Sequence, residues 1–154
     1  GEFCFRLRAS GFRLVETPAA IAEHGSRPRS TWLYPFQIRN SWHFMLKNYE
    51  LRTLVLIGPA LLVHEPLQFA ILAANGQAGA YFQAIRNLRG LSRGLAQDRR
   101  VVASLRRTHD REILAAAPLV VREDVAAGGL SRVAKRLYDG WLMAYWAVAS
   151  AFMK

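Results

Sequence analysis

Residues 39–74 read RNSWHFMLKNYELRTLVLIGPALLVHEPLQFAILAA, and this stretch decides the fold class. From Leu54 onward it is almost wholly apolar, and only His64, Glu65 and Gln68 interrupt the run of apolar residues. A helix needs about 20 apolar residues to cross a bilayer, and it tolerates few charges at its centre. The run is long enough to cross, but its polar interruption falls where the bilayer centre would be.

Two prolines, Pro59 and Pro66, also lie inside this apolar run. They predict two shorter helical pieces, Leu51–Pro59 and Ala60–Ala74, which lie in or dip into a membrane surface. Two alternatives remain open at this point. The first is a buried core helix with a proline kink, and the second is a helix that spans the bilayer.

The composition combines apolar and basic residues. Hydrophobic residues make up 52% of the 154 residues, and the formal net charge is +10. Proteins that bind nucleic acid usually carry Lys and Arg on a polar surface, whereas here arginines flank long apolar stretches. This pattern suits an anionic lipid surface, to which each basic residue contributes about 1 kcal/mol. We therefore expect an anionic membrane surface as a partner, and no nucleic acid.

The single cysteine, Cys4, cannot form an internal disulfide, and this fits a reducing cytoplasm. The first residues lack the basic, apolar and cleavage regions of a secretory signal, and the chain has no initiator methionine. We therefore expect the chain to begin inside a longer protein.

The first thirty residues predict a small mixed α/β segment. Glu2–Ser10 is interpreted as the end of a helix, which Gly11 terminates. Phe12–Glu16 and Ala20–His24 are predicted as short strands, and a loop rich in Gly, Ser and Pro follows them.

The rest of the chain predicts helices, because apolar residues recur at helical spacing from Thr31 onward. Asn75 and Gly76 interrupt the pattern after the central apolar stretch. Asp110 and Ser131 are predicted to cap the last two helices. The helices predicted after the interruption are Ala78–Gly94, Arg111–Ala117 and Arg132–Met153, and Gln97–Thr108 continues the first of them as a basic segment. The predicted fold class is mainly α, with amphipathic interfacial helices following the small α/β segment.

The end of the last predicted helix, Trp141–Met153, is uncharged and rich in Trp and Tyr. It is too short to span a bilayer. Aromatic residues beside Lys and Arg are typical of an interfacial anchor, and docking on the other helices is the alternative.

No complete catalytic motif is present: the sequence lacks a phosphate-binding glycine loop, zinc-ligand spacing and a GxSxG motif. Two isolated residues are candidates for chemistry. His24 ends a predicted strand beside a loop, from which an imidazole can reach a metal or a phosphate, although a surface histidine needs no such role. Glu2 begins a helix, where a carboxylate also complements the helix dipole without any catalysis.

The N-terminal third resembles a known family. Glu2–Val15 (EFCFRLRASGFRLV) and residues 18–26 (PAAIAEHGS) resemble the end of the catalytic domain of family 2 glycosyltransferases. Residues 39–40 (Arg-Asn) and 47–48 (Lys-Asn) are similar to a stretch that follows this domain in many bacterial members. The resemblance is strong over Glu2–Asn48, and beyond it only the basic, amphipathic character continues.

This resemblance implies a nucleotide-sugar-dependent enzyme of the GT-A fold. Residues 1–30 would end its catalytic domain, and residues 31–154 would form a helical membrane-associated region. Glu2 matches an acidic position of the catalytic side, and His24 matches a histidine close to the metal and diphosphate. The donor-binding half and its Asp-x-Asp motif are absent from this chain. Mg²⁺ or Mn²⁺ is therefore expected only with the full-length enzyme, with no cofactor in this chain and no turnover from it alone.

The leading functional hypothesis is the C-terminal portion of a bacterial glycosyltransferase at the cytoplasmic face of the inner membrane. Its partners would be the upstream catalytic domain, the anionic membrane surface and a lipid-linked or polysaccharide acceptor. The first alternative is a non-enzymatic basic domain that binds membranes or other helices. The second is nucleic-acid binding through Arg86–Arg107, a segment that lacks a recognition motif.

Overall fold

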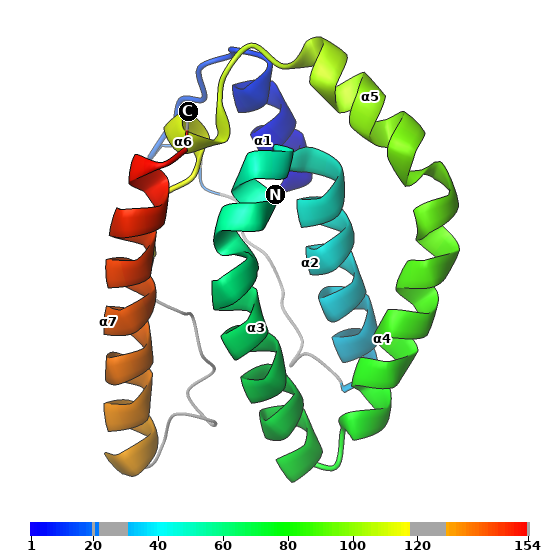
Figure 1. Ribbon diagram of the computed structural model, residues 1–154, viewed down its shortest axis with the longest axis vertical. Helices are drawn as coiled ribbons and strands as arrows, with labels where there is room; N and C mark the ends of the chain where they lie inside the picture. The colour runs from blue at the N-terminus through cyan, green and yellow to red at the C-terminus, as the bar shows by residue number, and fades with distance from the viewer. Residues whose placement is uncertain (20, 22–30, 118–128, 154) are drawn as a thin grey trace.

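The computed structural model describes residues 1–19, 21, 31–117 and 129–153, which form a mainly helical chain (Figure 1). Its α-helices are α1 (Glu2–Ala9), α2 (Tyr34–Asn48), α3 (Leu51–Ala74), α4 (Ala78–Leu91), α5 (Leu95–Leu105), α6 (Asp110–Ile113) and α7 (Gly129–Ala151). Two short 3₁₀ helices, η1 (Thr31–Leu33) and η2 (Ser92–Gly94), precede α2 and α5. The prediction of a mainly α fold is confirmed.

The helices lie side by side in one open arrangement (Figure 1). α2 packs against α4 and α5, and α3 packs against α4 on one side and α7 on the other. α4, η2 and α5 form a bent arc at the right of Figure 1, while α7 stands at the left. The short helix α1 packs against α6 at the top of the molecule.

Two helices end where the sequence predicts an interruption, and for the same reason. Gly11 follows α1 with a φ of 87°, and Gly76 follows α3 with a φ of 70°. Only glycine adopts such a conformation readily. At each end, backbone N–H groups beyond the helix donate to carbonyls of its last turn, as in Phe12 to Leu7 (3.0 Å) and Gln77 to Leu72 (2.7 Å). Both pairs belong to Schellman motifs.

The hydrophobic interior is small and divided between two clusters. The first joins α1, α2 and α6 through buried Phe5, Ala9 and Ile113, with Phe44 and Tyr49 packed against them. The second lies at the opposite ends of the central helices, where Ile38, Leu72 and Ala84 join α2, α3 and α4. Among the described residues, far more large hydrophobic side chains are exposed than buried. The chain by itself therefore leaves much of its apolar surface uncovered.

The central apolar stretch is one continuous helix, and the prediction of two pieces, Leu51–Pro59 and Ala60–Ala74, is wrong. Pro59 and Pro66 both lie inside α3. A proline inside a helix removes one backbone hydrogen bond and strains the turn before it, but the remaining bonds of a long helix can hold the segment together. Both prolines lie on the exposed side of α3.

The strand predicted over Phe12–Glu16 is also wrong: these residues are irregular, and the described part of the chain contains no strand that could pair with them. A strand needs a neighbour to complete its backbone hydrogen bonds. Of the second predicted strand, Ala20–His24, only Ile21 belongs to the described residues, so this prediction is not tested.

The predicted start positions of the last two helices need correction. Asp110 does not cap the helix predicted over Arg111–Ala117, because α6 begins at Asp110 itself, has His109 as its N-cap residue and ends at Ile113. α7 begins at Gly129, so Ser131 lies within its first turn instead of preceding it. The sequence pattern locates both helices and misplaces their ends by a few residues, which is usual for helix termini.

Candidate membrane interface

One side of α3 is mainly apolar and exposed, and Arg52 near the start of the helix is an exposed charge on the same side. We call this side the outward face of α3; it consists of Leu51, Val55, Pro59, Leu62, Val63, Pro66 and Leu67. Leu62 is 77% exposed, Leu51 70% and Val55 68%. These residues recur every three or four positions, so they form a single stripe on the helix surface. Among the described residues, α3 is the one helix that is long and apolar enough to cross a membrane.

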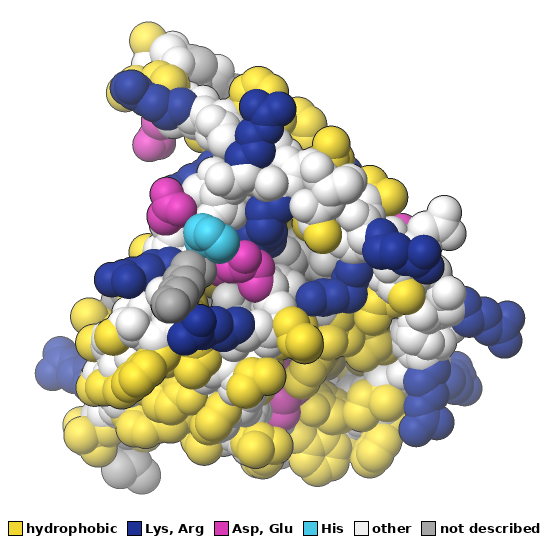
Figure 2. Space-filling model, turned by 45° about the horizontal axis from the view of Figure 1, so that its top comes forward, with side chains coloured by type: hydrophobic (Ala, Val, Ile, Leu, Met, Phe, Trp, Pro, Cys, Tyr) yellow, Lys and Arg dark blue, Asp and Glu magenta, His cyan; other side chains and the backbone are white. Residues whose placement is uncertain are grey.

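The last helix adds a second apolar stripe next to the first, because α7 packs alongside α3. Its most exposed hydrophobic residues are Leu137 (72%), Val148 (64%) and Val133 (54%), and Phe152, just after the helix, is 58% exposed. Figure 2 shows the hydrophobic side chains gathered in a broad band across the lower half of the molecule. A soluble monomer rarely exposes a continuous apolar patch larger than a few hundred Å², so this band marks a site of interaction.

Basic side chains border the apolar band, most clearly at its right-hand edge in Figure 2. The segment from α4 to the residues just after α5 carries five exposed arginines without an ion-pair partner among the described residues. These are Arg86, Arg89, Arg93, Arg100 and Arg107. Unpaired arginines beside an exposed apolar surface complement the phosphates of anionic lipids.

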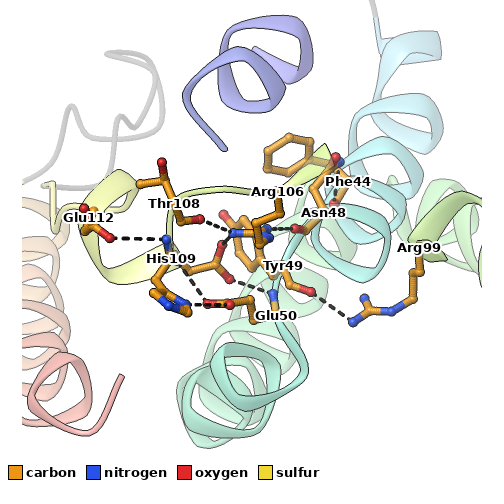
Figure 3. A network of polar contacts seen from close by, with 10 residues as sticks. Phe44, Asn48, Tyr49, Glu50, Arg99, Arg106, Thr108, His109 and Glu112 are labelled. Carbon is orange, nitrogen blue, oxygen red and sulfur yellow. Dashed lines mark hydrogen bonds and ion pairs between the residues drawn. The ribbon is translucent and has the colours of Figure 1, made fainter. Parts of the chain in front are cut away.

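A network of polar contacts, which we call the polar junction, joins the start of α3 to the start of α6 (Figure 3). The backbone N–H of Glu50 donates to Oδ2 of Asp110 (2.7 Å), and the N–H of Asp110 donates to Oε2 of Glu50 (3.1 Å). Glu50 is the N-cap residue of α3, so the Asp110 carboxylate lies beside the positive end of that helix dipole. The contact is reciprocal and links residues sixty positions apart in the sequence.

Two arginines of the polar junction satisfy carbonyls at the end of α2. Arg106 donates to the carbonyl of Asn48 and to Oδ1 of Asp110 (2.8 Å). Arg99 donates to the carbonyls of Leu46 and Tyr49, the latter at 3.0 Å. The last carbonyls of a helix have no partner within the helix, and cationic side chains there also complement the helix dipole. The two arginines therefore fasten α5 and the segment after it to the turn between α2 and α3.

The pKa values of two ionisable groups of the polar junction are shifted in directions that suit a structural role. Burial acts to raise the pKa of Glu50, but the N–H of Asp110, the His109 imidazole and the Arg106 charge outweigh it, so that the pKa is lowered. Burial and the Asp110 carboxylate raise the pKa of Tyr49. Glu50 is therefore ionised at neutral pH and Tyr49 is protonated. The ionised state of Glu50 matches the hydrogen bonds that its carboxylate accepts, and neither group is poised to transfer a proton near pH 7.

The two candidate site residues from the sequence have different outcomes. Glu2 lies at the start of α1 and forms an ion pair with Lys47 of α2. Burial acts against its charge, but this ion pair lowers the pKa of Glu2, and the contact holds α1 against α2. His24 lies outside the described residues, so its proximity to Glu2 stays a prediction. No group of three or more His, Cys, Asp or Glu within the described ranges could hold a metal ion.

Sequence reasoning did not find the polar junction. It identified Asp110 as a capping residue but assigned it to the wrong helix, gave Glu50 no role, and treated Arg99 and Arg106 only as members of the basic segment Arg86–Arg107. Nothing in the local pattern around these residues indicates that they meet, because the contacts join segments that are 50 to 60 residues apart. In comparisons with known proteins, no family model, no curated protein and no solved structure matches the chain.

Proposed function

We propose that this chain is the C-terminal part of a bacterial family 2 glycosyltransferase, and that it attaches the enzyme to the anionic cytoplasmic face of the inner membrane. The observation that carries the attachment is the outward face of α3, whose large apolar side chains are exposed in the described part of the chain. An exposed apolar stripe of this length is typical of a surface that binds a membrane or a partner.

The free energies of burying these side chains and of pairing the arginines favour a lipid surface as the partner of the outward face of α3. Removing one large aliphatic side chain from water contributes about 1.5–3 kcal/mol, and Leu51, Val55 and Leu62 are each more than two-thirds exposed. The bordering arginines add about 1 kcal/mol each at an anionic surface. The apolar contribution does not depend on salt, whereas the contribution of the arginines is screened by it. Attachment through both should weaken at high salt without disappearing.

The glycosyltransferase part of the proposal is supported by the resemblance over Glu2–Asn48. It is also supported by the way in which α1 is fixed to the other helices. Arg8 donates to the carbonyls of Ile113 and Glu112 (3.0 Å each), and the backbone N–H of Arg107 donates to the carbonyl of Ala9 (2.7 Å). A catalytic domain that ends in α1 would thereby be held at a constant angle to the apolar face. Its donor would be a nucleotide sugar, and its acceptor a lipid-linked sugar or a polysaccharide at the membrane.

Flotation with phosphatidylglycerol vesicles tests the attachment. The wild-type chain should float with the vesicles at low salt, and it should still float in part at 1 M salt. A variant with Val55→Asp and Leu62→Asp should stay at the bottom of the gradient even at low salt, because two carboxylates then interrupt the outward face of α3. The matched control is Gln97→Asp, which adds a carboxylate at an exposed position of α5 outside that face.

Two outcomes would contradict the attachment: a wild-type chain that does not float with anionic vesicles, or a V55D/L62D variant that floats as well as wild type. The glycosyltransferase part has its own test, which is the coding sequence before Gly1. An Asp-x-Asp motif within about 200 residues upstream, the size of a typical domain, is expected there. Its absence would remove the enzyme assignment and leave the membrane attachment in place.

A further inference from the structure

The inward side of α3 carries His64 and Glu65, which interrupt its apolar run, and each has a partner on a different helix. Nδ1 of His64 forms a hydrogen bond with the hydroxyl of Tyr138 in α7 (2.9 Å), and the two rings are stacked. The hydroxyl of Tyr81 in α4 donates to Oε2 of Glu65 (2.6 Å). Burial and this hydrogen bond raise the pKa of Tyr81 to about 12, so that Tyr81 keeps the proton that it donates.

A second contact joins α3 to α7 about two turns before His64, closer to the N-terminus of α3. The hydroxyl of Tyr145 donates to the backbone carbonyl of Leu56 (2.5 Å). Between the two contacts, Trp141 packs against the rings of both Tyr138 and Tyr145, with centroids 5.8 Å apart in each pair. The inward side of α3 is therefore held by hydrogen bonds at His64, at Glu65 and at Leu56, whereas the large apolar side chains of its outward face are exposed in the described part of the chain.

The partner helices cannot follow α3 across a bilayer. α7 carries the ion pair between Lys135 and Asp139 close to Tyr138. α4 carries the exposed arginines Arg86 and Arg89 within two turns of Tyr81. Charged groups are rare in the parts of membrane helices that lie in the hydrocarbon core, and where they occur they face other helices or water. A crossing α3 would have to leave these helices behind and carry an unpaired imidazole and carboxylate into the hydrocarbon.

Length alone does not decide between crossing and lying flat. The 24 residues of α3 extend over about 36 Å at 1.5 Å per residue, and the hydrocarbon core is about 30 Å thick. The prolines do not decide it either, because α3 is continuous through both of them. The contacts on the inward side of α3 therefore distinguish a helix that crosses from one that lies flat.

We propose that α3 binds the membrane through its outward face, with the helix axis in the membrane plane. The His64–Tyr138 and Glu65–Tyr81 contacts keep the helix from crossing. This inference rests on the proposed attachment and specifies its geometry. Both ends of α3 stay on the side from which the protein binds. The inward side of α3, with its contacts to α4 and α7, faces away from the lipid.

Cysteine accessibility on sealed phosphatidylglycerol vesicles tests this geometry. The native Cys4 is exposed on α1, which lies at the N-terminal end of α3. Asn75 is exposed just beyond the C-terminal end of α3. A membrane-impermeant maleimide is added from outside to floated protein, either with Cys4 alone or with C4S and N75C. Both cysteines should be labelled fully before the vesicles are permeabilised, because neither end crosses.

The contacts are tested in the same background by His64→Leu together with Glu65→Leu. This variant should reduce the labelling of the cysteine at position 75 at least threefold, and permeabilisation should restore it, because the helix can then cross. Gln68→Leu is the matched control: it raises the apolarity of α3 without removing a hydrogen bond, and it should leave the labelling unchanged. Circular dichroism of the floated proteins checks that their helix content is equal.

Each outcome has a distinct meaning. Failure of the wild-type chain to float overturns the proposed attachment and, with it, this inference. Wild-type protein that floats but protects position 75 until permeabilisation overturns this inference alone, because α3 then crosses. An H64L/E65L variant that floats and is labelled like wild type also overturns it, since the contacts then do not control the geometry.

Discussion

Replacing Asp110 by alanine is the most informative perturbation of the polar junction. The Asp110 side chain is fully buried, and its two carboxylate oxygens accept from the Glu50 N–H (2.7 Å) and from Arg106 (2.8 Å). The variant leaves the Arg106 guanidinium, which is only 12% exposed, without its counter-charge. It also removes the acceptor at the N-terminus of α3.

The expected loss in the free energy of unfolding is about 3 kcal/mol. Removing one partner of a buried ion pair typically costs about 3–5 kcal/mol. The lower part of that range applies here because Arg106 keeps the carbonyls of Asn48 and Thr108 as acceptors. Such a loss is a large fraction of the total stability of a domain, which is about 5–15 kcal/mol.

Urea unfolding in nonionic detergent micelles, followed by tryptophan fluorescence, measures this loss, and the slope with urea shows whether two-state behaviour is kept. Asp98→Ala is the matched control, because Asp98 also lies in the first turn of a helix but is exposed. Its cost should stay below about 1 kcal/mol. The double variant Arg106→Met with Asp110→Ala should be less destabilised than Asp110→Ala alone, since no unpaired buried charge remains.

A D110A variant within about 0.5 kcal/mol of wild type would refute this reasoning, because it would mean that the buried pair contributes no more than an exposed residue. A double variant that loses the sum of both single losses would refute it as well. Additive losses indicate that the two groups do not interact.

Two further predictions concern the side chains of Glu50 and Tyr145. Because the pKa of Glu50 is lowered in the folded chain, its carboxylate stabilises the fold above the unfolded value of about 4.5, and this contribution is lost as the pH falls through the folded pKa. Glu50→Gln should therefore have a lower free energy of unfolding than wild type at pH 7, and this difference should shrink by pH 3. Urea unfolding measures it, and an equal difference at both pH values would contradict the lowered pKa of Glu50. Tyr145→Phe should cost about 1 kcal/mol by removing the hydrogen bond to the Leu56 carbonyl, and an unchanged unfolding midpoint would show that this contact does not contribute.

The candidate interface was largely predictable from the sequence, whereas its geometry was not. The run from Leu54 to Ala74 indicated an apolar helix, and its end at Asn75-Gly76 followed from the glycine that the Schellman motif needs. The two prolines suggested a break that the helix does not have. Proline disfavours a helix locally, but the hydrogen bonds and packing along the rest of a long helix outweigh that local effect.

Local sequence determined the helical periodicity, the helix ends marked by Gly11 and Gly76, and the coexistence of apolar and basic surfaces. These properties depend on residues within a few positions of one another, so neighbours suffice to predict them. Tertiary structure alone decided that Asp110 meets Glu50, that Tyr138 meets His64, and which side of α3 stays uncovered. Such contacts depend on the path of the chain between distant segments, and a hydrogen-bond partner sixty or seventy residues away leaves no periodic trace in the sequence.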